Sequence, residues 1–148
     1  MPLSVVLVGP EPVMARDCDA SIIGVLADIR NRGAVLANTS RSNANNYNGN
    51  PFASSEELVI ALDGSGSGSS NPKLAVQVAR NILMSKSLNL TWSKQIMEAC
   101  PDLVIVGFGM WSTGWLNSFY RFKDGQIRPK VCTSTLEPST IWGVGWCD

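Results

Sequence analysis

The 148-residue chain contains no histidine, and this absence excludes several kinds of active site. Neither a Ser-His-Asp nor a Cys-His arrangement can be built from it, so any nucleophile must be activated by an amine, a carboxylate or backbone dipoles. The four cysteines also lack the Cys-x-x-Cys spacing of paired metal ligands. A zinc site would need thiolates and carboxylates alone, and we therefore expect no metal and no cofactor.

An excess of one charge and long apolar runs are also missing. Twelve basic residues balance twelve acidic ones, and the basic residues do not cluster. This balance gives no electrostatic support for binding to nucleic acid or to an anionic membrane. No apolar stretch approaches the ~20 residues of a membrane span. Zero net charge and five tryptophans favour self-contact, so we expect a homo-oligomer.

The N-terminal segment and the cysteines predict a cytoplasmic location. The apolar run at residues 3–9 is short and lacks the basic region that opens a secretory signal peptide. An even number of cysteines permits disulfides. Without a secretory signal, however, we expect reduced and mostly buried thiols.

Hydrophobic patterning predicts a single domain that mixes strands with helices. One domain is the expected number for a chain of this length. Short β-branched or apolar runs indicate strands, and apolar residues spaced three to four apart indicate helices. The predicted strands are residues 3–9, 20–27, 34–37, 57–62, 103–108, 118–122, 126–128 and 140–146, and the predicted helices are residues 72–86 and 89–100.

The order of these elements predicts an α/β or α+β domain built in layers. Two helices would pack on a largely antiparallel sheet or on a pair of sheets. A long polar segment at residues 38–55, rich in Asn, Ser and Gly, is expected to be an exposed loop. Such loops often bind ligands, although a merely mobile loop fits the composition equally well.

The segment DGSGSGSSNPK, residues 63–73, connects a predicted strand to a predicted helix. It matches neither the phosphate loop G-x-x-x-x-G-K-[ST] nor the dinucleotide fingerprint G-x-G-x-x-G, because Ser69 replaces a required glycine in both. Free N–H groups before a helix still favour an anion or a developing oxyanion, and the alternative is a solvated connection. The candidate ligand-binding residues are Gly64, Ser65, Gly66 and Asn71.

The candidate catalytic residues are Arg41, Ser40 and Cys18. The planar guanidinium of Arg41 suits a carboxylate or a phosphate, although most loop arginines are simply hydrated. Cys18 lies between two aspartates, whose charges disfavour the reactive thiolate. Ser40 and Cys18 are therefore weak nucleophile candidates.

Several segments together resemble the Ntn-type fold, the four-layered αββα sandwich of proteasome β-subunits and related amidohydrolases. They follow the order of that family's opening hairpin, its strand with a Gly-Ser-Gly turn and core helix, and its later strands. The similar segments are residues 20–25, 33–41, 57–66 with the helix at Pro72, 103–108, 119–127 and 142–145.

The resemblance implies a mechanism other than proteolysis, because Ala20 occupies the position of the family's nucleophile. Archaeal IMP cyclohydrolases share the fold without self-processing, and residues 39–42 are similar to a Ser-Arg-Ser segment in them. The resemblance thus implies that Arg41 orients a substrate. It also implies that backbone N–H groups of residues 64–66 stabilise an oxyanion.

We therefore expect a small anionic or amide-containing ligand between the 38–55 loop and the 63–71 turn. The enzymatic version of this hypothesis hydrolyses or cyclises a C–N bond without self-processing. Its alternative is a non-enzymatic assembly or ligand-sequestering protein with a degenerate site. Residues 101–107 also suggest an SGNH-like esterase, but the histidine of that mechanism is missing.

Overall fold

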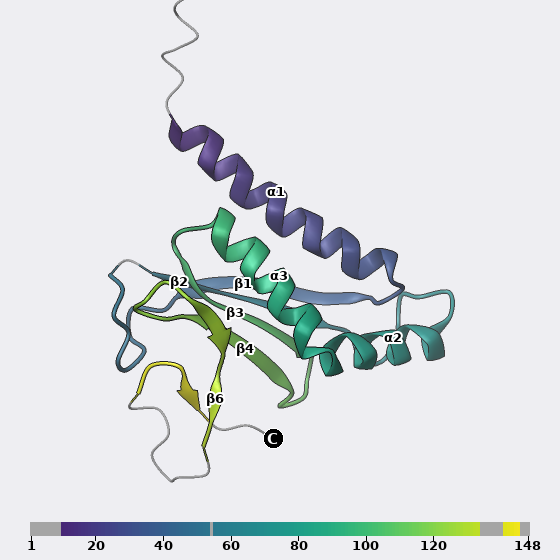
Figure 1. Cartoon of the computed structure of the whole chain (residues 1–148). Coiled ribbons are helices and arrows are strands. Elements are labelled where there is room, and N and C mark those ends of the chain that lie inside the picture. Colours follow the sequence, from purple (N-terminus) through teal and green to yellow (C-terminus); the bar gives the residue numbers. More distant parts are fainter. Residues whose placement is uncertain (1–9, 54, 134–140, 146–148) are drawn as a thin grey trace, which may run out of the picture.

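The computed structural model describes residues 10–53, 55–133 and 141–145. Within them the chain forms helices and strands in the order α-β-β-α-α followed by strands (Figure 1). The helices are α1 (Pro10–Asn31), α2 (Pro72–Met84) and α3 (Lys86–Ala99). The strands are β1 (Leu36–Asn43), β2 (Glu56–Leu62), β3 (Leu103–Met110), β4 (Leu116–Arg121), β5 (Ile127–Pro129), β6 (Val131–Cys132) and β7 (Val144–Gly145).

The first five strands form one mixed sheet in the order β1-β2-β3-β4-β5. The pair β2–β3 is parallel, and the other neighbouring pairs are antiparallel. A parallel pair needs a crossover, and here α2 and α3 supply it. Strands β6 and β7 pair separately as a small parallel sheet. The fold is therefore α+β, as expected in outline, with one mixed five-stranded sheet and a small two-stranded sheet.

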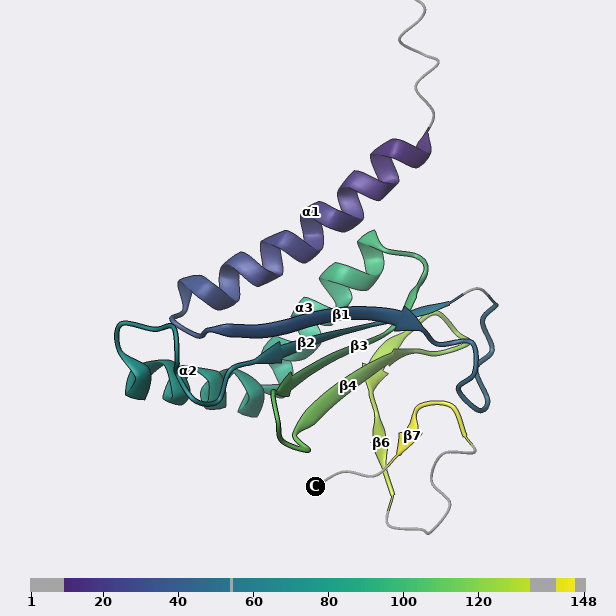
Figure 2. The same ribbon diagram turned by 180° about the vertical axis from the view of Figure 1, so that it is seen from behind.

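The helices share one hydrophobic core with one face of this sheet. Figures 1 and 2 show α1 and α3 on one side and the β6–β7 segment on the other. Val25 of α1, Ile82 of α2 and Ile96 of α3 join this core, together with Ile60 of β2 and Phe108 of β3. We call this side the helix-covered face and the opposite side the helix-free face. Among the described residues no helix lies over the small sheet, so the fourth layer of an αββα sandwich is not seen there.

Both central helices are present, and α2 begins at Pro72 as predicted, but it ends at Met84 and α3 begins at Lys86, three residues before the expected start. The cap of α3 is Ser85 and not the expected segment at residues 89–91. The Asn71 side chain accepts a hydrogen bond from the backbone N–H of Leu74, and Pro72 takes the first helical position. The N–H of Ser85 donates to Asn81 and Ile82 at the end of α2. Its hydroxyl oxygen also accepts from the N–H of Leu88 at the start of α3.

Residues 20–27, expected as a strand, lie inside α1. The residues that pack toward the core are Cys18, Ile22, Val25, Leu26 and Ile29, which recur at helical spacing. The expectation of a strand followed the β-branched residues of this run and overlooked that period. The indole of Trp92 then fixes α1 to α3 by donating to the Asp28 carboxylate at 2.9 Å.

The first strand of the sheet extends into the beginning of the segment at residues 38–55 that was expected to be loop. Strand β1 reaches Asn43, and its side chains are exposed from Ala37 onward. An edge strand that buries few side chains shows no apolar alternation, so its sequence reads as a loop. The expected strand at residues 3–9 lies outside the described residues, as do the ends of the one expected at 140–146.

Cys18 of α1 and Cys100 at the end of α3 form a disulfide with a Cα–Cα distance of 4.7 Å. Cys132 is also disulfide-bonded. The expectation of reduced thiols is therefore wrong, and the predicted cytoplasmic location loses that support, because disulfides persist mainly in oxidising compartments. Within the described ranges, no helix has both the length and the hydrophobicity needed to cross a membrane.

Candidate functional site

The expected catalytic residues are engaged in contacts of their own. Both Nε and Nη2 of Arg41 contact Oε1 of Glu56, at 2.8 and 2.7 Å. Its Nη1 lies 3.8 Å from the sulfur of Cys18, on the helix-covered side. Ser40 directly precedes Arg41 in β1. Because side chains alternate along a strand, that of Ser40 points to the opposite face of the sheet. Cys18 is oxidised, so it offers no thiolate for attack, which corrects its assignment as a nucleophile.

In the 63–71 turn, the backbone N–H of Ser65 donates to a side-chain carboxylate of the same turn. The backbone N–H of Ser65 donates to Asp63 Oδ1 at 2.9 Å, and the Ser65 hydroxyl donates to the same oxygen at 2.8 Å. The Ser67 hydroxyl donates to Oδ2 at 3.1 Å. These hydrogen bonds, led by the Ser65 N–H, hold the pKa of Asp63 below its usual value. The Ser65 amide is thus occupied and does not point to an oxyanion.

The glycines of this turn have a structural explanation. Gly66 adopts φ +74°, and a Cβ there would lie 2.5 Å from the carbonyl oxygen of Pro72. Only glycine fits that close approach at that φ. Asn71 acts as the N-cap of α2, as described above.

The same turn has the hard oxygen ligands that Mg²⁺ prefers, on Asp63, Ser65 and Ser67. It contributes a single carboxylate. In the part of the chain that the structure describes, no group of three or more His, Cys, Asp or Glu side chains could hold a metal ion.

The sheet separates the two halves of the expected site. Arg41 pairs with Leu58 near the start of β2, whereas the turn begins after Leu62 at its end. Five residues of strand correspond to about 16 Å. The loop that connects β1 to β2 and the 63–71 turn therefore lie at opposite ends of β2, and they do not enclose a common ligand site.

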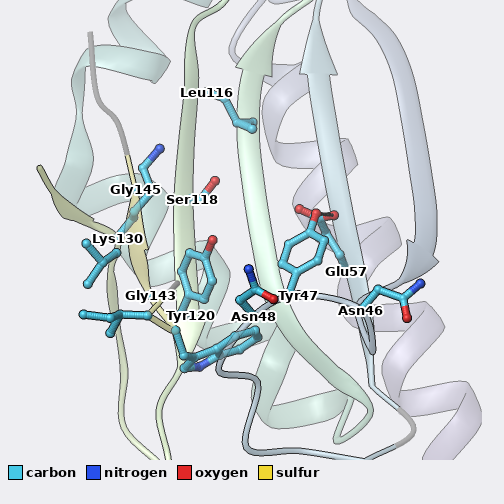
Figure 3. A pocket seen from close by; sticks show the side chains of 13 residues that line it. Asn46, Tyr47, Asn48, Glu57, Leu116, Ser118, Tyr120, Lys130, Gly143 and Gly145 are labelled. Atoms are coloured by element: carbon cyan, nitrogen blue, oxygen red, sulfur yellow. Dashed lines mark hydrogen bonds between the residues drawn. The ribbon is translucent and has the colours of Figure 1, made fainter. Parts of the chain in front are cut away.

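A different pocket, of about 460 Å³, opens on the helix-free face (Figure 3). We call it the sheet pocket. Side chains of β4 form part of it, because Leu116, Ser118 and Tyr120 alternate with residues that face the helices. Its lining residues are Asn46, Tyr47 and Asn48 of the β1–β2 loop, Glu57 of β2, Leu116, Ser118 and Tyr120 of β4, Lys130, and Ile141, Trp142, Gly143, Val144 and Gly145.

One wall of the sheet pocket is aromatic and held in place. Tyr120 and Trp142 meet edge to face, with ring centroids 4.9 Å apart and planes at 88°. The indole N–H of Trp142 donates to the carbonyl oxygen of Arg121 at 2.9 Å. Gly143, at φ +79°, brings this segment so close that a Cβ would lie 2.4 Å from the Phe122 ring. The wall is therefore fixed to β4 before any ligand arrives.

The opposite side of the sheet pocket carries a carboxylate. The Tyr47 hydroxyl donates to Glu57 Oε1 at 2.5 Å. Burial raises the pKa of Tyr47, and the hydrogen bond and the charge of Glu57 raise it further. Burial and the charge of Glu57 also raise the pKa of Tyr120. Both phenols consequently stay protonated at neutral pH, under the negative potential of Glu57.

Sequence reasoning named none of the charged or aromatic residues in this pocket. Tyr47 lies in the polar segment that was considered as a binding loop, whereas Glu57, Tyr120 and Trp142 lie in predicted strands. A weak signal was present in the alternation of β4, which places a serine and a tyrosine on the side opposite Phe119. The loop therefore does line a pocket, although at the other end of β2 from the turn expected to complete it.

No protein-family model, no curated protein and no solved structure matches this chain, so the functional argument depends on the geometry and chemistry of the sheet pocket.

Proposed function

We propose that this protein binds a small organic molecule in the sheet pocket without transforming it. The observation that carries the proposal is the fixed Tyr120–Trp142 wall facing the Glu57 carboxylate across the pocket. Small-molecule sites are concave, largely apolar and furnished with a few oriented polar groups. A volume of about 460 Å³ falls inside the range of such sites.

The proposal retains the ligand-binding part of the sequence-based hypothesis and changes its location. C–N hydrolysis requires a nucleophile, an orienting cation and oxyanion donors within a few ångströms of one reacting group. Here Arg41 is paired with Glu56, Cys18 is oxidised, and the Ser65 amide donates to Asp63. The non-enzymatic alternative is therefore favoured. An Ntn-like relationship adds nothing to it, because the expected site of that family is not assembled.

The disulfide supports placing this function in an oxidising compartment, because reducing cytosols keep thiols free. The redox state of the thiols in protein isolated under alkylating conditions tests this location directly. Fully alkylated Cys18 and Cys100 would contradict it.

A screen of chemically varied small molecules tests the proposed function. Hits are detected by an increase in melting temperature, because a ligand that binds the folded state stabilises it by mass action. Tyr120→Ala should abolish the increase. Trp111→Ala is the matched control, since Trp111 is a 55% exposed aromatic residue that does not line the sheet pocket.

Ser118→Phe provides a second route to the same answer without removing the aromatic wall. Ser118 is 8% exposed and lines the pocket from β4, so a phenyl group there occupies ligand space. Hits that survive both Tyr120→Ala and Ser118→Phe would contradict the proposal, as would a screen without hits.

A further inference from the structure

The sheet pocket places one carboxylate among aromatic rings. Tyr47, Tyr120 and Trp142 line it together with Glu57. Figure 3 shows the Tyr47 ring beside Glu57, and the Tyr120 ring between Tyr47 and Lys130. Aromatic faces carry negative electrostatic potential and attract cations, most strongly where water is partly excluded. The aromatic rings and the Glu57 carboxylate therefore both favour a positively charged ligand.

Glu57 retains hydrogen-bonding capacity after its contact with Tyr47. A carboxylate offers about four acceptor positions. The Tyr47 hydroxyl uses one of them, on Oε1. Among the described residues, no other side chain donates a hydrogen bond to Glu57 or forms an ion pair with it. Its charge is thus held in place by one neutral donor, and no cation of the described residues cancels it.

The one basic side chain in the lining lies apart from this carboxylate. In Figure 3, Lys130 and Glu57 lie on opposite sides of Tyr120. The aliphatic stem of Lys130 runs along Gly145, where an added Cβ would be 3.0 Å from the lysine Cδ. The negative charge of the pocket therefore lies at Glu57, near Tyr47 and Tyr120. The raised pKa values of Tyr47 and Tyr120 agree with this position of the charge, because Glu57 adds to the effect of burial on both.

We propose that the ligand is an organic cation, in which an ammonium group lies between Glu57, Tyr47 and Tyr120 and an apolar body contacts Trp142. This inference rests on the proposed function, since it names the chemical class for the same pocket. A primary ammonium would donate to Glu57, and a quaternary ammonium would be held by charge and by the ring faces. Both forms share the positive charge on which recognition depends.

Two pairs of probes of matched shape test this class. Choline is compared with 3,3-dimethylbutan-1-ol, its neutral carbon isostere, and benzyltrimethylammonium is compared with neutral benzyl alcohol. Binding is followed by two-dimensional NMR of the tryptophan indole N–H signals, with the Trp142 signal assigned from Trp142→Phe. Each cation should bind at least about tenfold more tightly than its neutral counterpart.

Glu57→Gln separates charge from shape, because glutamine keeps a side-chain acceptor for the Tyr47 hydroxyl. It should weaken cation binding about tenfold and leave binding of the neutral probes unchanged. Glu98→Gln is the control, since it removes the same charge from an exposed position on α3. A melting temperature close to that of the unchanged protein would show that Glu57→Gln still folds.

The outcomes distinguish this inference from the function on which it rests. Equal binding of cations and neutral probes, or an unchanged choline affinity in Glu57→Gln, would overturn the cation assignment and leave small-molecule binding in place. Failure of both cations to bind at millimolar concentration, with neutral hits from the screen, would also overturn the assignment alone. Failure of every compound would overturn both.

Discussion

The two faces of the five-stranded sheet use alternate residues of the same strands for different purposes. On β4, Asn117 and Arg121 point to the helix-covered face, whereas Ser118 and Tyr120 point to the sheet pocket. The Asn117 amide donates to the carbonyl oxygen of Leu83 and to the side-chain oxygen of Asn89, at 2.7 and 3.0 Å. The polar groups on this face therefore stabilise the ends of helices.

Arg121 makes further side-chain contacts on the helix-covered face, although its Nε has no hydrogen-bond partner among the described residues. Its Nη2 donates to the carbonyl oxygens of Met97 and Leu103, at 2.7 and 3.0 Å. Burial lowers the pKa of Arg121. A cation near the last turn of a helix also complements the helix dipole. On the helix-free face, by contrast, a single side chain of the described residues donates a hydrogen bond to Glu57. Asn117 and Arg121 thus use their side chains to hold the helices against the sheet, whereas the Glu57 carboxylate keeps acceptor positions for a ligand.

The largest effect on stability should come from the disulfide of the helix-covered face. It joins residues 82 positions apart. Its loss in Cys18→Ala/Cys100→Ala should lower the free energy of unfolding by about 4 kcal/mol, because the unfolded chain regains loop entropy. Urea denaturation measures this change. Where the variant remains folded, ligand binding in the sheet pocket should persist, and selective loss of binding would break the distinction between the faces.

The next largest effect should follow from Arg121→Met. This change keeps much of the apolar stem and removes the hydrogen bonds to a carbonyl near the end of α3 and to the first carbonyl of β3. We therefore expect a loss of about 3 kcal/mol in urea denaturation. Arg128→Met serves as a control, because the Arg128 side chain is 48% exposed and pairs with Asp124 at 3.3 Å. It should cost less than about 1 kcal/mol. Equal losses in the two variants would refute the special role of Arg121.

Removal of a polar contact on the helix-free face should affect stability less. Tyr47→Phe deletes the hydrogen bond to Glu57 in a loop residue that is 40% exposed. The expected loss is about 1 kcal/mol or less, because the bond is near solvent. The same change frees an acceptor on Glu57, so cation binding should be retained. A loss of unfolding free energy as large as that of Arg121→Met would mean that polar contacts on the two faces contribute equally to stability.

The smallest effect concerns the 63–71 turn and appears only in acid. Hydrogen bonds from Ser65 and Ser67 lower the pKa of Asp63 below its usual value of 3.8 in the folded state. The stabilisation by this carboxylate is therefore present above pH 3.8 and is lost as pH falls through the lower folded pKa. Asp63→Asn should slightly flatten the pH dependence of melting temperature in this range. An unchanged acid profile would contradict the contribution of these hydrogen bonds.

Local signals predicted the central part of the fold. Strand β3 is a continuous apolar run, and α2 has its own cap in Asn71 followed by Pro72, so each could be recognised without tertiary information. The region around Ile22 and Val25 was misread because β-branched residues occur in both strands and helices. Strand β1 was missed because an exposed edge carries no apolar alternation.

The sheet pocket was beyond prediction from local patterns. Tyr47, Glu57, Tyr120 and Trp142 come from separate parts of the chain and meet only through strand pairing and the return of the 141–145 segment. The expected site failed for the converse reason. Its residues were chosen for their individual chemistry, and the register of β1 against β2 then placed Arg41 away from the turn that begins after Leu62.

A chemical-shift map of the most tightly bound screening hit tests the central claim most directly. Amide and indole N–H signals are recorded for the full chain during a titration. We expect shift changes centred on Tyr47, Glu57, Tyr120 and Trp142, with little change on the helix-covered face around Asn89 and Asn117. Changes centred on Arg41 or on the 63–71 turn, with none in the sheet pocket, would contradict it.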